Sequence, residues 1–264
     1  MEYFEKIEKN PYEDLKWNVP ERKQGIVNVI GGNAQSFRSE VKVAEFLAGT
    51  YPVQEVRVVM PDKLKGKLPP LPNFVFAPST DTGSFAESQE LLDFFSASDY
   101  NLVLGDLSHN KVTGRAVASA CKSAEKMTLV TRDAVDIIAE NMPERVLMNE
   151  NIVFMASVAQ LQKLLRAVYY PKMLLMSSSL VQVVEVLHKF TLSYPVSVVT
   201  LHNEQVLVAH NGIVKAMTLS ATGYSPMMFW SGEAAAKIVG MNLYNPNQFV
   251  EATICGVSTQ DRCW

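Results

Sequence analysis

Cysteine is scarce in this 264-residue sequence, which contains only Cys121, Cys255 and Cys263. Their odd number and wide spacing argue against a disulfide framework and against a zinc site, and they favour a reducing, cytoplasmic location. No run of about 18 apolar residues occurs, so we expect no membrane-spanning helix and no membrane partner. The amino-terminal stretch "MEYFEKIEKN" also lacks the apolar core of a signal peptide.

The chain also lacks an excess of positive charge, because 24 Lys and Arg residues against 27 Asp and Glu residues give a formal net charge of −3. A chain without a basic excess lacks the electrostatic footprint of a nucleic-acid-binding protein, so we expect no nucleic-acid partner. The sequence has no cluster of residues with the spacing of metal ligands and no Ser/His/Asp set with catalytic spacing. His188 and His210 each lack a partner at such spacing. A metal site of the protein's own is therefore not predicted.

Short apolar runs alternate with helical stretches of about 10 to 15 residues, which is typical of a parallel sheet with crossover helices. "PVSVVTL", "QVLVAH" and "IVKAMTL" instead follow one another with tight polar turns and predict antiparallel strands at one edge, near residues 196 to 218. The pattern predicts a three-layer α/β/α fold with a mostly parallel central sheet. In such sheets ligands bind beyond the carboxyl ends of the strands.

The chain is long enough for one large domain or two small ones. Residues 1 to 24 form a polar arm in our prediction, with a helix from Tyr3 to Leu15. Residues 25 to 264 form a single α/β domain.

The first glycine-rich turn is Gly31-Gly32-Asn33, which follows the strand-like run "IVNVI". Glycine frees backbone amides to approach a phosphate or a ribose, and the following helix adds positive potential. A tight strand-to-helix turn without a ligand explains the same residues. Both interpretations stay open on sequence alone.

Two further strand ends carry acidic residues. Gly105 and Asp106 follow "YNLVL", and Asp133 follows "MTLVT". These groups are candidates for binding a substrate at the carboxyl edge of the sheet. The alternative is that Asp106, Ser108 or Asp133 caps the helix that comes next.

The stretch "FWSGEAAAKIVG" contains a third turn, Ser231-Gly232-Glu233, at the start of a predicted helix. The free amides of the first helical turn suit an anion such as a nucleotide phosphate, and Glu233 can orient a hydroxyl group or a water molecule. The alternative is an ordinary helix start, with Ser231 as the N-cap residue and Glu233 favoured by the helix dipole.

The order of these segments resembles the ribokinase-like superfamily, specifically the ADP- or ATP-dependent NAD(P)H-hydrate dehydratases. That family has a strand and Gly-Gly turn, then "GPG", "DADALN", "TPHPGE", a late "KG" and "GMATGGTGD" at a long helix. The corresponding places here read "VIGGN", "LGDL", "TRDAVD", "FMASVAQL", "TLHNEQVLV" and "SPMMFWSGE". The resemblance covers about residues 25 to 260.

The resemblance implies roles for residues at the matching positions. Glu233 stands in the place of the catalytic aspartate, and Ser231, Gly232, His202 and Asn203 in places that bind the nucleotide. Substrate-binding positions are Gly31, Gly32, Asn33, Gly105, Asp106 and Asp133. ATP or ADP, with Mg²⁺, and an NAD(P)H-like small molecule are the ligands implied, and a homo-oligomer is compatible with the resemblance.

Several motifs depart from the family pattern. Thr131 replaces the first aspartate of "DAD", the proline–histidine–proline turn and the late lysine are absent, and Trp230 fills a glycine position. Glutamate at 233 is longer than aspartate by one methylene, and a misplacement of about 1 Å costs on the order of a hundredfold in rate. The sequence therefore predicts a diverged, nucleotide-binding relative with weak or no catalysis. The alternatives are an active dehydratase, a silent protein that binds a metabolite or another protein, and a small-molecule kinase.

Overall fold

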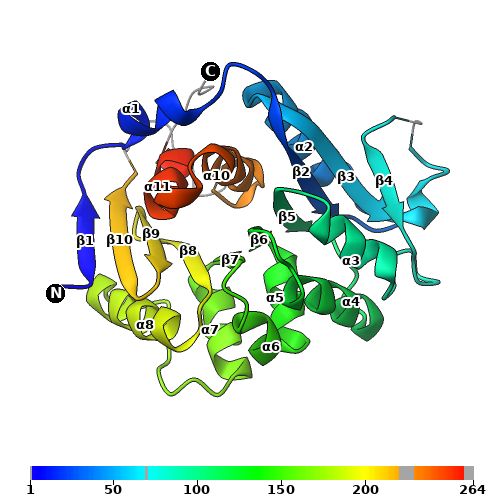
Figure 1. Ribbon diagram of the computed structural model, residues 1–264. Coiled ribbons are helices and arrows are strands. Elements are labelled where there is room, and N and C mark those ends of the chain that lie inside the picture. The colour runs from blue at the N-terminus through cyan, green and yellow to red at the C-terminus, as the bar shows by residue number, and fades with distance from the viewer. Residues whose placement is uncertain (1, 69–70, 220–228, 259–264) are drawn as a thin grey trace.

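A single ten-stranded sheet runs through the computed structural model, which describes residues 2–68, 71–219 and 229–258 (Figure 1). The strand order across the sheet is β1-β10-β9-β8-β7-β6-β5-β2-β3-β4. The strands are β1 (Phe4–Ile7), β2 (Gln24–Gly31), β3 (Val53–Pro61), β4 (Phe74–Ala77), β5 (Tyr100–Gly105), β6 (Thr128–Thr131), β7 (Ile152–Met155), β8 (Ser197–His202), β9 (Gln205–His210) and β10 (Ile213–Thr218).

The strands from β8 to β4 across the sheet pair in parallel, whereas β9 runs antiparallel to both β8 and β10. The predicted mostly parallel sheet with antiparallel strands at one side is therefore confirmed. Strands β5, β6 and β7 are buried throughout, and β2 is buried over its last five residues, because helices cover both faces of this part of the sheet.

Helices form a layer on each face (Figure 1). One face carries α1 (Tyr12–Leu15), α2 (Arg38–Thr50), α10 (Glu233–Tyr244) and α11 (Phe249–Ser258). The other carries α3 (Gln89–Ser96), α4 (Lys111–Lys122), α5 (Asp133–Glu140), α6 (Pro143–Leu147), α7 (Val158–Ala167) and α8 (Leu180–Ser193). Each layer packs on its own cluster of buried apolar side chains, which completes the predicted three-layer architecture.

The amino-terminal arm differs from the prediction of a helix from Tyr3 to Leu15. Phe4–Ile7 form strand β1, which pairs in parallel with β10, and only Tyr12–Leu15 are α-helical. The free edge of β10 satisfies the backbone of this segment, and the Val214 amide donates to the Tyr3 carbonyl at 2.8 Å. Ladder hydrogen bonds at a sheet edge thus outweigh the local helical preference. The domain boundary at residue 24 stays a prediction.

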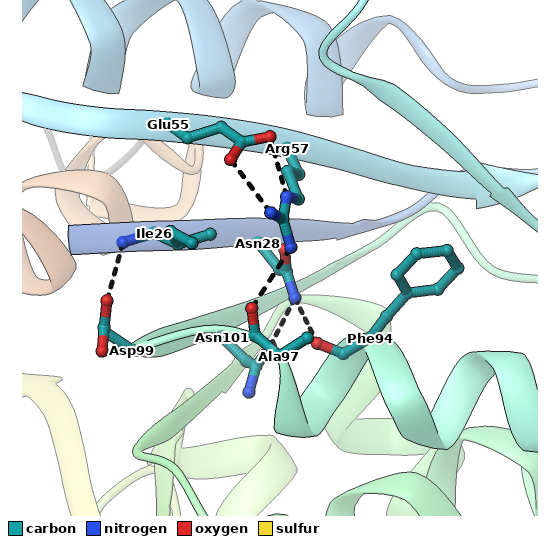
Figure 2. A network of polar contacts seen from close by, with 8 residues as sticks. All are labelled: Ile26, Asn28, Glu55, Arg57, Phe94, Ala97, Asp99 and Asn101. Atoms are coloured by element: carbon teal, nitrogen blue, oxygen red, sulfur yellow. Dashed lines mark hydrogen bonds and ion pairs between the residues drawn. The ribbon is translucent and has the colours of Figure 1, made fainter.

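A buried polar network fixes the end of α3 against β2 and β5 (Figure 2). The Asn28 amide group donates to the Phe94 carbonyl at 2.5 Å and to Asn101 Oδ1 at 3.2 Å. Asn101 Nδ2 in turn donates to the Phe95 carbonyl at 2.9 Å. These contacts satisfy carbonyl groups that a helix leaves free at its carboxyl end. Both asparagines are fully buried, so the network anchors neighbouring strands whose opposite ends carry the candidate site.

Among the described residues, no helix has the length and apolar character needed to cross a lipid bilayer.

Candidate functional site

The first two predicted turns lie against each other because β2 and β5 are parallel neighbours. The Gly32 amide donates to the Gly105 carbonyl at 3.0 Å. The Asn33 side chain donates to the Asp106 carbonyl at 2.6 Å. A Cβ atom on Gly31 would lie 2.5 Å from the Gly105 carbonyl oxygen, so the close approach of these two turns requires glycine at position 31. The structure therefore brings Gly31, Gly32 and Asn33 together with Gly105 and Asp106.

Asp133 joins the same cluster from the end of β6. Its two carboxylate oxygens accept hydrogen bonds from the backbone amides of Asp106, at 2.8 Å, and Leu107, at 3.0 Å. The capping alternatives for these residues do not hold. Arg132 is the N-cap residue of α5, and Asn110 caps α4 through a 2.8 Å hydrogen bond from the Thr113 amide. Asp133 instead fixes the backbone of the neighbouring turn.

The start of α10 packs against Leu104, the residue before Gly105 in β5, and against Val43 of α2. Gly232 is the N-cap residue, with φ of +94°, and a Cβ atom there would lie 2.9 Å from Leu104 and 3.0 Å from Val43. The prediction of Ser231 as the N-cap residue is thus wrong by one position, because only glycine fits the left-handed conformation and the close packing. Ser231 Oγ accepts from the Glu233 amide at 3.4 Å. Residues 220 to 228, which precede this helix start in the sequence, lie outside the described part of the chain.

Glu233, the predicted catalytic residue, is engaged by a cation on its own helix. Lys237 Nζ lies 3.2 Å from Glu233 Oε1, one helical turn further along α10. The Lys237 side chain is only 7% exposed, whereas that of Glu233 is 39% exposed. The carboxylate thus forms an ion pair with a nearly buried ammonium group, which also lies 5.8 Å from the centre of the Phe46 ring.

His202 and Asn203 occupy the β8–β9 hairpin. Asn203 and Glu204 both have positive φ, 46° and 62°, which is typical of a type I′ turn. The His202 ring is buried, and its Nε2 atom lies 3.1 Å from Asn203 Nδ2. In sheet order β8 is three strands from β5, a separation of about 14 Å. These two residues share the carboxyl edge with the other predicted residues, but within the described ranges no hydrogen bond or ion pair links them to the three turns.

Sequence reasoning missed Glu40 and Arg132, which complete the cluster. The Glu40 side chain is fully buried, and its Oε1 atom lies 2.6 Å from where a Cβ atom on Gly31 would be. Burial, followed by the like charge of Asp106, raises the pKa of Glu40 to about 8. Arg132 Nη2 lies 3.1 Å from Asp106 Oδ1. A signal for Glu40 was present, because it precedes the buried Val43, Ala44 and Leu47 at helical spacing and so shares their face.

The backbone at this edge is strained. Asp106 and Arg132 both have positive φ values, 51° and 55°, although neither is glycine. Such conformations cost on the order of 1–3 kcal/mol each and concentrate at functional sites. Two strained residues that also form the Asp106–Arg132 ion pair mark this strand end as the candidate site.

The raised pKa of Glu40 predicts a pH-dependent stability that Glu40→Gln removes. In the folded chain the pKa of Glu40 is about 8, so it holds its proton up to that pH, whereas in the unfolded chain it ionises near the ordinary carboxyl pKa of 4.5. Between these values the unfolded state binds fewer protons, so the stability contribution falls as the pH rises, by up to about 1.4 kcal/mol per pH unit. Urea unfolding of both proteins from pH 5 to pH 9 measures this. A stability difference that stays flat across that window contradicts it.

In the described part of the chain, the carboxyl edge of the sheet has groups that suit a nucleotide phosphate but not a set of side chains that would hold a metal ion by themselves. Within residues 2–68, 71–219 and 229–258, no three His, Cys, Asp or Glu side chains gather to hold a metal ion. An Mg²⁺ ion would therefore depend on nucleotide phosphates and water for most of its ligands. The start of α10, with Gly232 free of a side chain, does suit an anionic group.

Two surface grooves lie away from this edge. One of about 900 Å³ runs along β4 and includes Leu71 and Phe74, and one of about 690 Å³ lies beside α8 and includes Met173 and Leu175. Neither includes a residue of the strand-end cluster, so the candidate site rests on its chemistry and strain rather than on groove volume.

Comparisons with known proteins agree on the architecture. A ribokinase-like superfamily protein from Enterococcus faecalis aligns with a TM-score of 0.70 and 15% identity, over 98% of this chain and 86% of that one. A ribokinase from Thermotoga maritima aligns with a TM-score of 0.54 and 13% identity, over 92% of this chain and 95% of that one.

The chain has the ribokinase-like fold.

An ADP/ATP-dependent NAD(P)H-hydrate dehydratase from Bacillus subtilis, co-crystallised with ATP and Mg²⁺ and soaked with CoA, shares this ribokinase-like fold. It aligns with a TM-score of 0.60 and 11% identity, over 94% of this chain and 84% of that one. No family model matches the sequence, and no curated protein matches it. At such identities the alignments show the fold alone.

Proposed function

We propose that this ribokinase-like chain binds a nucleotide and is a diverged relative of the NAD(P)H-hydrate dehydratases with weak or no catalysis. The ion pair between Glu233 and Lys237 is the observation that carries the proposal. It leaves the helix start available to an anion, while it binds one oxygen of the carboxylate that would act as base to a nearly buried ammonium group.

Nucleotide binding is supported by the geometry of α10. The helix is 12 residues long, begins directly after Gly232, and presents amides at a position next to Leu104 at the end of β5. The positive end of a helix stabilises phosphate groups through these amides and the helix dipole. The similar dehydratase was co-crystallised with ATP and Mg²⁺. We therefore assign ATP or ADP, carrying its Mg²⁺, to the Ser231–Glu233 turn, with His202 and Asn203 as the further nucleotide-binding positions.

Weak catalysis is supported by the state of Glu233. A general base must carry a lone pair that reaches the reacting proton. The Glu233 carboxylate is instead bound to Lys237 Nζ at 3.2 Å, and the lysine is nearly buried. Removing the carboxylate from this pair would take an ion-pair partner away from a nearly buried ammonium group, which is costly. The same pair would restrain a small-molecule kinase, in which this acidic residue would also act as base.

The test of nucleotide binding is a thermal-shift series with ATP, ADP, AMP, NADH and NADPH. A nucleotide at about 100 times its Kd stabilises the folded state by about 2.7 kcal/mol, which corresponds to a rise in Tm of roughly 5–10 °C for a chain of this size. Ser231 is exposed beside the first amides of α10, so Ser231→Glu should abolish the shift by repelling phosphate.

Ser231→Gln is the matched control, because it has the same size without the charge, and it should keep most of the shift. A shift that survives Ser231→Glu would place the nucleotide elsewhere. No shift with any of the five compounds would leave a silent interaction protein as the better interpretation.

A further inference from the structure

Among the described residues, four of the nine buried side-chain polar atoms that lack a hydrogen-bond partner lie in one cluster, where the first turn of α2 meets the carboxyl ends of β2, β5 and β6. They are Glu40 Oε1, Glu40 Oε2, Asp106 Oδ2 and Arg132 Nη1. A buried polar atom that lacks a partner lowers stability, and native structures contain few of them. Four such atoms in three adjacent side chains therefore indicate that a partner belongs there.

The cluster reaches the protein surface even though these atoms are covered. The side chains of Asp106 and Arg132 are 15% and 25% exposed, while Glu40 is fully buried behind them. Gly31 and Gly105 form the backbone floor, and a Cβ atom on either one would meet Glu40 or Asp133. Because neither position has a side chain, the Glu40 and Asp133 carboxyl groups can lie directly against the backbone at the ends of β2 and β5.

The charges decide which chemistry suits the cluster. Asp133 directs both carboxylate oxygens to backbone amides, and Asp106 and Arg132 balance each other as an ion pair. No cation in the described part of the chain hydrogen-bonds to Glu40, and burial raises its pKa to about 8, so at neutral pH it is a neutral carboxyl group that both donates and accepts. Carboxylates beside it disfavour an anion, and the arginine disfavours a cation.

We propose that Glu40, Asp106 and Arg132 form a recognition subsite for an uncharged ligand group that both donates and accepts hydrogen bonds, such as a carboxamide or a pair of adjacent hydroxyl groups. This assignment rests on the proposed function, because it places the non-nucleotide ligand beside the anion-binding start of α10. Asp106 accepts from the ligand, the protonated Glu40 carboxyl group both accepts from it and donates to it, and Arg132 Nη1 donates to it. The strain at Asp106 and Arg132 is retained because it aims these atoms at the ligand.

Glu40 variants separate recognition from structure. Glu40→Gln keeps a neutral group with a donor and an acceptor, whereas Glu40→Met has similar length and no strong hydrogen-bonding group. If Glu40 serves a ligand, Glu40→Met removes two unsatisfied atoms and raises the Tm of the ligand-free protein by about 2–4 °C. If Glu40 serves the fold, the same change lowers the Tm. Differential scanning calorimetry of the full chain measures this without any ligand.

Binding is measured by NMR titration of the full chain with nicotinamide, nicotinate and ribose. Nicotinamide carries an uncharged carboxamide where nicotinate carries an anionic carboxylate, and ribose presents hydroxyl groups alone. The series therefore shows whether the subsite binds a carboxamide or a pair of hydroxyl groups. We expect nicotinamide or ribose to bind at least about tenfold more tightly than nicotinate. That binding should persist in Glu40→Gln and be lost in Glu40→Met.

Equal binding of nicotinamide and nicotinate, binding of none of the three, or a Tm that falls in Glu40→Met would each overturn the assignment. ADP binding by the unmodified protein is measured in parallel. If ADP binds and none of the three probes does, the subsite fails and the nucleotide site stands. If a probe binds as expected and ADP does not, the nucleotide part of the proposed function fails instead.

Discussion

The Gly105→Ala protein is expected to unfold with a free energy about 3–5 kcal/mol lower than that of the parent. Gly105 has φ of +114°, a conformation that L side chains rarely adopt, and its Cβ atom would lie 2.0 Å from Asp133 Oδ1. Asp133 must then move and release the amides of Asp106 and Leu107, which it now binds at 2.8 and 3.0 Å. Backbone strain and the loss of two charge-assisted hydrogen bonds both lower the free energy of unfolding, and their sum is the large decrease expected.

Gly49→Ala is the matched control for this substitution. Gly49 lies in α2, and its Cβ atom would meet no atom within 4 Å. Alanine is favoured over glycine in a helix by about 0.5–1 kcal/mol, so this change should stabilise the protein slightly. Equilibrium unfolding in urea measures both. If Gly105→Ala unfolds within about 1 kcal/mol of the parent, Asp133 does not hold the turn in the manner described.

Much of the candidate site follows from the sequence because parallel strands end at one edge. Gly31, Gly105 and Asp133 each follow an apolar run, and that rule places their turns at the same edge of the sheet. The strand order β2-β5-β6, which the rule does not give, makes them neighbours. The Glu233–Lys237 pair is also readable in the sequence, since residues four apart share a helix face. The spacing does not show that Lys237 is buried, and this burial makes the loss of its ion-pair partner costly.

Other parts depend on tertiary contacts that no local pattern encodes. The positive φ values of Asp106 and Arg132 occur together with their ion pair and with the Asp133 hydrogen bonds, all of which join residues far apart in the sequence. Strand β1 exists because β10 offers a free edge more than 200 residues along the chain, and its own sequence "FEKI" has mixed polarity. Glu40 was readable in principle, but a glutamate in a first helical turn fits the helix dipole, and that simpler explanation hides its burial.

The catalytic consequence of the Glu233–Lys237 pair gives the last expected result. With hydrated NADH and ATP or ADP, the unmodified protein should restore NADH slowly, measured as recovery of NADH absorbance. A chain that combines Trp230→Gly, Glu233→Asp and Lys237→Met should be faster by about a hundredfold, provided that the rest of the site survives. Aspartate withdraws the carboxylate by about one methylene, and a shift of about 1 Å is worth on the order of a hundredfold in rate.

Methionine is the appropriate replacement for Lys237, because the side chain is 7% exposed and a thioether of similar length fills the space without an unpaired charge. Lys237→Met alone separates the two effects: it frees the carboxylate but leaves it displaced, so its rate should lie between those of the parent and the triple variant. Brisk turnover by the unmodified protein, abolished by Glu233→Gln, would show that a base paired to a buried ammonium still works, and the chain would then be an active dehydratase. If neither variant exceeds the parent, the missing lysine and histidine motifs, rather than the ion pair, account for its low activity.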